Sequence, residues 1–149
     1  MIQLIRTNSK NVDFKNLVTF LDAALKISDG EEHEFYDQFN KIDGLKHVVI
    51  AYKNKVAVGC GAFKIHTGNF IEIKRMYVSP NGRRNGIASK ILLELETWAK
   101  ELNFEKSILE TGKKQPEAIE LYKKCNYTIT SNFGIYKNIE NSVCFTKLL

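Results

Sequence analysis

Residues 78–88 read VSPNGRRNGIA, and this stretch decides the fold. The apolar alternation of a strand ends at Val78, a polar and basic loop follows, and helical spacing begins near Gly86. The first turn of a helix exposes unpaired N–H groups and the positive end of the helix dipole, so such a turn favours phosphate. The spacing GxxxxGK(S/T) is missing, which argues against a P-loop nucleotidase. The stretch therefore predicts a phosphate-binding turn between a strand and a helix.

The sequence before this loop predicts one strand, two helices and then three strands. Residues 2–6 alternate as a strand, and residues 14–25 carry apolar side chains at helical spacing, with Asn11 as a candidate cap. Residues 28–30 interrupt this helix, and a second short helix is expected at Glu31–Asn40. The three strands are expected at Lys46–Lys53, Lys55–His66 and Phe70–Val78, with a tight turn at Asn54.

The sequence after the loop predicts a helix, a strand, a second helix and two final strands. The first helix is expected to bury Ile87, Ile91, Leu95, Trp98 and Leu102. Pro116 opens the second helix, which ends at Cys125, and Asn126 tolerates the left-handed conformation that follows. The strands are expected at Ser107–Glu110, Tyr127–Thr130 and Ser142–Leu148. Hairpins followed by β-α-β crossovers imply an α+β fold, in which a mixed sheet carries helices on its faces.

Length and composition describe one globular domain spanning residues 1–149. The chain weighs 17.1 kDa and has 44% apolar and 26% charged residues, which argues against intrinsic disorder. The apolar runs are too short to cross a bilayer, and the N-terminus lacks the apolar segment of a signal peptide. We therefore expect a cytoplasmic protein without a membrane partner.

The charge and the metal-binding residue types narrow the function classes further. A net charge of +5 suits nucleic acid, an anionic surface or a polyanionic cofactor, but no nucleic-acid-binding motif accompanies it. The three cysteines form no CxxC pair and the three histidines are dispersed. This pattern argues against a disulfide framework and against a metal site. We expect reduced cysteines and no nucleic-acid partner.

Two motifs in this order resemble those of the GNAT N-acetyltransferase family. Residues 83–88, RRNGIA, match the acyl-CoA-binding signature (Q/R)-x-x-G-x-(G/A). Residues 117–127, EAIELYKKCNY, are similar to the family's A-x-x-L-Y-x-x-x-G-(F/Y) segment. The part of the chain that carries this resemblance is roughly residues 56–149, and the N-terminal third matches only in its pattern of elements. The resemblance implies a mixed six- to seven-stranded sheet flanked by about four helices, acetyl-CoA as cosubstrate and no metal.

The resemblance also implies roles for individual residues. The pantetheine of the coenzyme would pair with main-chain groups at Met76 and Val78, in a gap beside that strand. Tyr122 would donate a hydrogen bond to the coenzyme sulfur, and Glu72 would act as a base, usually through water. Gln115 stands where many members have an asparagine that touches the coenzyme. The pyrophosphate would lie on Arg83, Arg84, Asn85, Gly86, Ile87 and Ala88, with Ser89 near.

Simpler interpretations of the two catalytic candidates stay open. Tyr122 shares a helical stripe with Ala118 and Cys125, which also describes an ordinary core aromatic. Glu72 alternates with apolar residues and so points away from them together with Lys74 and Met76. A solvated strand carboxylate paired with Lys74 explains this pattern as well.

Signals for the acceptor are weaker. Residues 31–37 contain four acidic side chains, which either attract a cationic amine or complement the dipole of a helix start. The loop Asn132–Asn141, which contains Tyr136, is a candidate lid. Asn126 stands where the family usually has a glycine, which is a tolerable change of cap.

These observations predict acetyl transfer from acetyl-CoA to the primary amine of a small molecule by direct attack. No covalent enzyme intermediate is required, and neither Cys125 nor Cys144 is proposed as a nucleophile. Two alternatives stay open: acetylation of a protein or peptide amine, and a CoA-binding regulatory module without turnover. A homodimer formed through the last strand, Ser142–Leu148, is an expectation from the family alone.

Overall fold

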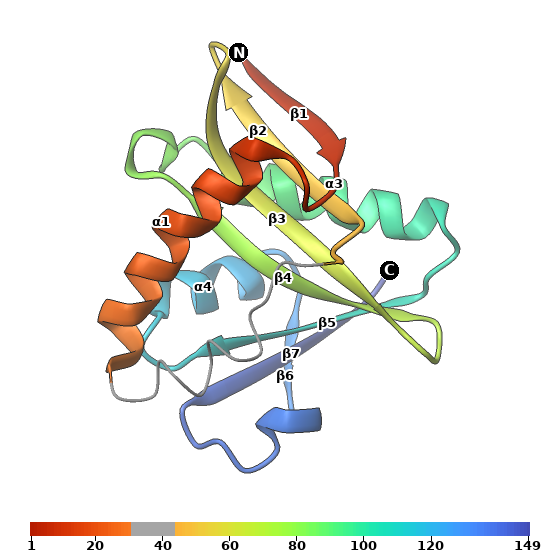
Figure 1. The fold of residues 1–149 in the computed structure, drawn as a ribbon. Coiled ribbons are helices and arrows are strands. Elements are labelled where there is room, and N and C mark those ends of the chain that lie inside the picture. The colour runs from red at the N-terminus through yellow and green to blue at the C-terminus, as the bar shows by residue number, and fades with distance from the viewer. Residues whose placement is uncertain (31–43) are drawn as a thin grey trace.

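The computed structural model of the protein describes residues 1–30 and 44–149 and contains a seven-stranded mixed sheet (Figure 1). The strands are β1 (Ile2–Thr7), β2 (His47–Lys53), β3 (Val56–His66), β4 (Phe70–Val78), β5 (Lys106–Gly112), β6 (Thr128–Thr130) and β7 (Ser142–Leu148). Their order across the sheet is β1-β2-β3-β4-β5-β7-β6, and β4 and β5 form the parallel pair. The predicted mixed sheet is confirmed, with β3 in its interior.

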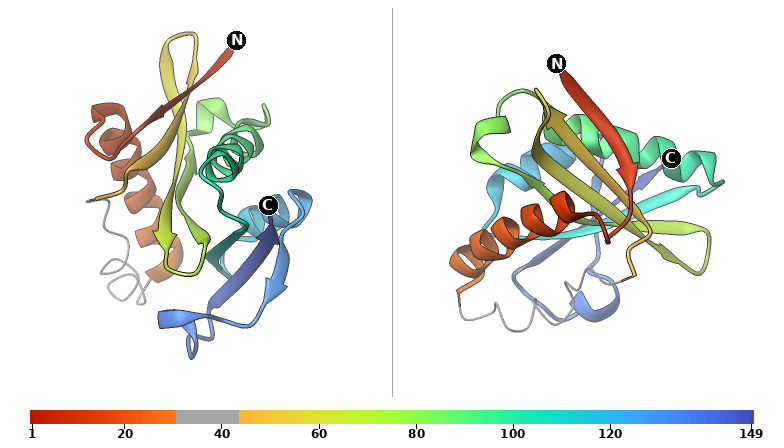
Figure 2. Two further views of the ribbon diagram at one scale, coloured as in Figure 1. Left: turned by 90° about the vertical axis from the view of Figure 1, so that its right-hand side faces the viewer. Right: turned by 45° about the horizontal axis from the view of Figure 1, so that its top comes forward.

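Helices cover both faces of the sheet in the described part of the chain. Helix α1 (Val12–Asp29) lies on one face, and α3 (Ile87–Glu101) and α4 (Pro116–Lys124) lie on the other (Figure 2). Two 3₁₀ turns, η2 (Pro80–Gly82) and η3 (Gly134–Tyr136), lie in the connecting loops. The helix expected at Glu31–Asn40 falls outside the described residues. None of the described helices is both long and apolar enough to cross a membrane.

The predicted caps and turns explain where the elements start and stop. The side chain of Asn11 accepts a hydrogen bond from the Phe14 N–H at 3.1 Å and so begins α1. Asn54 has φ 51° in the β2–β3 turn, and Asn126 has φ 71° after α4. Asparagine tolerates this left-handed conformation better than most residues, which fits both positions. Pro116 occupies the first turn of α4, as predicted.

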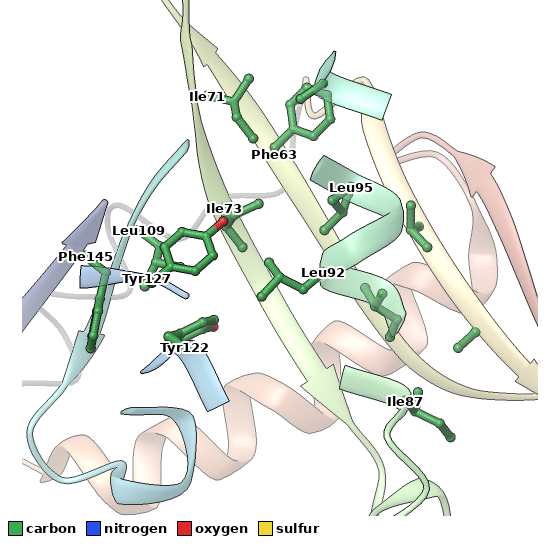
Figure 3. Close-up of a cluster of buried hydrophobic side chains, with 14 of the residues drawn as sticks. Phe63, Ile71, Ile73, Ile87, Leu92, Leu95, Leu109, Tyr122, Tyr127 and Phe145 are labelled. Atoms are coloured by element: carbon green, nitrogen blue, oxygen red, sulfur yellow. The ribbon is translucent and has the colours of Figure 1, made fainter. Parts of the chain in front are cut away.

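Two hydrophobic clusters hold the helices to the sheet. On the α1 face, Phe14, Leu17 and Val18 pack against β2 and β3. The larger cluster, part of which Figure 3 shows, joins α3 and α4 to five strands and includes Leu92, Leu95, Tyr122, Tyr127 and Phe145.

The buried side of α3 differs in part from the predicted stripe. Ile87, Ile91 and Leu95 are buried as predicted, but Leu102 is 42% exposed. The prediction was wrong there because α3 ends at Glu101, so Leu102 is already outside the regular helix. The helix buries Leu92 and Ala99 beside the predicted residues.

A β-bulge in β4 changes which face its side chains occupy. Cys60 pairs with Tyr77 and Ala62 with Lys74, so Gly61 alone lies opposite Arg75 and Met76. The extra residue reverses the alternation of the strand. Ile71, Ile73, Met76 and Val78 therefore all pack in or against the α3 cluster. The expectation that Met76 shares a face with Glu72 and Lys74 was wrong, because alternation assumes an unbroken register.

The parallel pair β4–β5 is short and leaves a gap in the sheet. The two strands pair through three positions, Phe70–Lys106, Ile71–Ser107 and Glu72–Ile108. β4 then continues to Val78 and β5 to Gly112 without further pairing to each other. The sheet is therefore open between the two strands beyond Glu72 and Ile108.

Candidate active site

The gap between β4 and β5 opens into two adjoining pockets. The inner pocket is lined by Glu72, Met76, Gln115 and Tyr122, among residues of α1, β4, β5, α4 and η3. The outer pocket extends along the end of β4 towards the start of α3. Residues that line both pockets are Leu21, Leu25, Met76, Gln115, Ala118 and Tyr122. The structure thereby brings both predicted catalytic residues to one pocket and connects that pocket to the predicted phosphate loop.

Glu72 is a buried and doubly paired carboxylate at the inner pocket. Its side chain is 7% exposed. Oε1 lies 2.8 Å from Nε2 of His66, and Oε2 lies 3.1 Å from Nζ of Lys74. The pairing with Lys74 agrees with the simpler interpretation of the sequence, but the carboxylate is enclosed by protein instead of being solvated. Lys74 thus places a positive charge beside the carboxylate.

Tyr122 belongs to the core and to both pockets at once. Its ring centroid lies 6.0 Å from that of Tyr127 and 5.8 Å from that of Phe145. Figure 3 shows the three side chains within the buried cluster. Burial, followed by the negative charge of Glu110, raises the pKa of the Tyr122 hydroxyl. The hydroxyl therefore keeps its proton at neutral pH and can act as a hydrogen-bond donor.

Side chains of the loop before α3 donate hydrogen bonds to nearby main-chain carbonyls. The Arg83 Nε donates to the Val78 carbonyl at 2.9 Å, and the Asn85 side-chain amide donates to the carbonyls of Gly82 and Arg83 at 3.4 and 3.3 Å. Gly86 is the N-cap of α3 and has φ 68°. A Cβ at Gly86 would have no atom within 4 Å, so the space above the helix start is open.

The predicted coenzyme-binding residues separate into two groups. Val78, Arg83 and Ala88 line the outer pocket together with Met76 and Gln115. Others lie at the start of α3 without lining either pocket: Arg84, Asn85, Gly86, Ile87 and Ser89. Among these, Ile87 is buried in the core, so its side chain is not presented to a ligand.

Two residues in or beside the inner pocket were not predicted from the sequence. Arg75 lines the inner pocket, is 6% exposed and pairs with Asp22 of α1. Its position depends on the bulge, which leaves no mark in the sequence pattern. His66 is one of the dispersed histidines of the sequence, and its pairing with Glu72 follows from the register of the β3–β4 hairpin.

The candidate lid contributes Tyr136 to the inner pocket. This residue is 4% exposed, and its hydroxyl oxygen lies 3.5 Å from Nζ of Lys74, which donates to it. The described residues contain no group of three or more histidine, cysteine or acidic side chains placed to hold a metal ion.

The relatives found by comparison with known protein sequences all carry acetyltransferase names. A sequence model of the acetyltransferase (GNAT) family matches residues 16–127. The IAA acetyltransferase of Azospirillum brasilense is 36% identical over 89 residues, which are 59% of this chain and 58% of that protein. The uncharacterized N-acetyltransferase YjgM of Escherichia coli strain K12 is 30% identical over 109 residues, covering 71% of this chain and 64% of that protein. The chain thus spans less than two thirds of the length of these relatives.

Comparison with solved structures agrees with the fold. A Klebsiella pneumoniae protein provisionally named an acyl-CoA N-acyltransferase superposes with a TM-score of 0.84 at 27% identity, covering 100% of this chain and 98% of that one. The PaiA N-acetyltransferase of Thermoplasma acidophilum, solved in complex with coenzyme A, gives a TM-score of 0.74 at 16% identity. It covers 100% of this chain and 99% of that one, a likeness of fold alone.

Proposed function

The chain belongs to the GNAT acetyltransferase family, and on this premise we propose that it transfers the acetyl group of acetyl-CoA to the primary amine of a small molecule. The observation that carries the proposal is the gap between β4 and β5. It runs from the start of α3 to a pocket that holds a buried carboxylate and a protonated tyrosine.

The residues along the gap fit the chemistry of acetyl-CoA. The part of β4 that does not pair with β5 includes Met76 and Val78, and its main chain would offer hydrogen-bonding groups to the amides of the pantetheine arm. The Val78 carbonyl already accepts from Arg83 Nε. The first amides of α3, next to the open space at Gly86, suit the pyrophosphate. Arg83 and Arg84 add positive charge to the same loop.

A small-molecule amine fits the inner pocket. Its lining comes from α1, β4, β5, α4 and η3, so it is bounded on several sides. The carboxylate of Glu72 lies in this enclosed end and would attract an ammonium group.

The reaction needs a neutral amine, and the pocket supplies a group to take its proton. A lysine-like amine has a pKa near 10.4, so forming the neutral amine at pH 7 costs about 5 kcal/mol. Glu72, directly or through water, would accept the amine proton as the nitrogen attacks the thioester carbonyl. The C–S bond then breaks, and the Tyr122 hydroxyl would donate a hydrogen bond to the sulfur that leaves with the electron pair. Complete transfer of the phenol proton to the thiolate is uphill by about 2 kcal/mol or more, so hydrogen bonding is the role that we assign.

Calorimetric titration of acetyl-CoA into the wild type and an Arg84→Glu variant tests the cosubstrate. Arg84 is exposed with φ 68°, and Lys55, exposed with φ 68° in the β2–β3 turn, is its matched control. We expect micromolar binding by the wild type, a loss of about tenfold in Arg84→Glu, and a smaller change in Lys55→Glu. Absence of binding by the wild type would contradict the assignment of acetyl-CoA.

A screen of amines with acetyl-CoA then tests the acceptor class. Release of free coenzyme A with a small primary amine supports the proposal. Turnover with peptides alone would replace the small-molecule acceptor with a protein or peptide amine. Tight acetyl-CoA binding without turnover on any amine would favour a CoA-binding module.

A further inference from the structure

Glu72 lies between the inner pocket and a histidine that does not line it. The hairpin pairs His66 with Phe70 and Lys64 with Glu72, which places His66 diagonally across from the carboxylate. Nε2 of His66 lies 2.8 Å from Oε1 of Glu72. The Glu72 side chain is 7% exposed and that of His66 is 29% exposed. The pair therefore forms a short path from a buried carboxylate to the surface.

Of the two side chains paired with Glu72, one alone can take a proton from it. Lys74, 3.1 Å from Oε2, carries an ammonium group that has donors and no acceptor. The side chain of His66, by contrast, is an imidazole, which has an acceptor nitrogen when it is neutral and can carry a proton on either ring nitrogen.

The imidazole is held in position by an aromatic neighbour. The ring of Phe70 stacks on it with centroids 5.0 Å apart and planes 9° from parallel. The ammonium of Lys106 lies 4.8 Å from the centre of the Phe70 ring. This stack keeps Nε2 directed at the carboxylate while part of the ring remains open to water.

We propose that His66 is a proton-relay residue that carries to solvent the proton collected by Glu72. The inference rests on the proposed function, in which Glu72 accepts the amine proton. The amine N–H bond breaks as an O–H bond forms on Glu72, and this bond breaks as an N–H bond forms at Nε2 of His66. The imidazolium then gives its Nδ1 proton to water, and the hydrogen left on Nε2 donates to the restored Glu72 carboxylate. Exchange with water returns the ring to the tautomer with hydrogen on Nδ1 before the next proton transfer. No group is oxidised or reduced, and Glu72 is again a carboxylate for the next turnover.

The test compares acetyl transfer by the wild type, His66→Gln and His47→Gln in buffers with and without imidazole. Glutamine keeps a hydrogen-bonding side chain beside Glu72 but cannot relay a proton. His47 stacks on Phe63 and lies at the edge of Trp98 on the α3 side, so it is the control histidine. We expect the kcat of His66→Gln to fall about tenfold, with the KM for acetyl-CoA unchanged, and added imidazole to restore it. Neither the wild type nor His47→Gln should respond to imidazole.

The outcomes separate the relay from the reaction itself. If the wild type turns over and His66→Gln matches it, or loses activity without a response to imidazole, the relay is wrong and the acetyltransferase assignment is unaffected. If the wild type acetylates no amine although it binds acetyl-CoA, the proposed function and the relay both fail. Acetyl-CoA binding by calorimetry checks that His66→Gln is folded, and His66→Asn provides the same test should it not be.

Discussion

Tyr122 packs in the core and is also the residue that we propose as the hydrogen-bond donor to the coenzyme sulfur. The ring contacts Tyr127 and Phe145 in the core, whereas the residue also lines the two pockets. Because burial raises the pKa of the hydroxyl, the hydroxyl stays protonated across the neutral pH range. Its ionisation therefore does not shape the pH dependence of the reaction rate in that range. The ring would therefore contribute to stability, whereas loss of the hydroxyl alone would change the reaction rate and leave the packing intact.

Replacing Tyr122 with phenylalanine should lower kcat about tenfold or more and leave acetyl-CoA binding nearly unchanged. The ring packing is kept, so the free energy of unfolding should change by less than about 1 kcal/mol. Steady-state kinetics and urea unfolding check both points. Tyr127→Phe is the matched control: it removes the 2.8 Å hydrogen bond to Ser107 and should cost stability, but Tyr127 lines neither pocket. An unchanged kcat in Tyr122→Phe would contradict the donor role.

The bulge in β4 and Gly61, the residue opposite it on β3, together determine where the Met76 side chain lies. A Cβ at Gly61 would collide with the Met76 sulfur and would lie 2.9 Å from Ile91 and 3.0 Å from Leu95. Glycine at this position therefore lets Met76 turn to the α3 face beside the gap. The bulge also places Arg75 where it pairs with Asp22 of α1.

A Gly61→Ala variant should lose about 1–3 kcal/mol of unfolding free energy and bind acetyl-CoA more weakly, because Met76 must move. Gly59→Ala is the control two residues earlier on the same strand. Its Cβ would meet Ile91, the Tyr77 carbonyl and Ile87 at 3.0–3.2 Å, which is tight but less severe. Urea unfolding and calorimetry measure both effects, and equal losses in the two variants would argue against a special role for Met76.

The elements could be predicted from the sequence because their signals are local. Apolar periodicity, the cap at Asn11 and the first helical residue Pro116 predicted the described helices, and the predicted bounds of β4 agree with the structure. The bulge could not be predicted, because two residues opposite one is a property of the pairing with β3.

The candidate site was predictable to the extent that the resemblance to the family supplied it. Glu72 and Tyr122 were predicted and do meet in one pocket, while their roles stay predictions. The pairing of Glu72 with His66, and of Arg75 with Asp22, depends on tertiary placement that no local pattern contains.

At the scale of the whole molecule, tyrosines on different elements make stability depend on alkaline pH. Burial and the 2.6 Å hydrogen bond to Asp13 raise the pKa of Tyr52 to about 12, and burial also raises the pKa values of Tyr122 and Tyr127. A folded-state pKa above the unfolded value of about 10 gives stability that is fully present below pH 10. That stability is lost as the pH rises through the folded-state value.

We therefore expect the free energy of unfolding to fall as the pH rises from 10 towards 12. Tyr52→Phe should be less stable than the wild type at pH 8, because it loses the bond that joins β2 to α1, and should show a shallower decline above pH 10. Urea unfolding at a series of pH values checks this. A parallel decline in both proteins would assign the alkaline sensitivity to other groups.

Strands β4 and β5 pair at three positions, and this pairing joins the two parts of the sheet. Strands β1–β4 and strands β5–β7 form two parts of the sheet that pair with each other at one end of β4 and β5. The hydrophobic cluster under α3 and α4 packs against both parts. A coenzyme bound in the gap would act as an eighth strand, because it would bridge the parts of β4 and β5 that do not pair with each other. Each turnover that released the product coenzyme would then remove that bridge and leave the two parts of the sheet joined by the three paired positions alone.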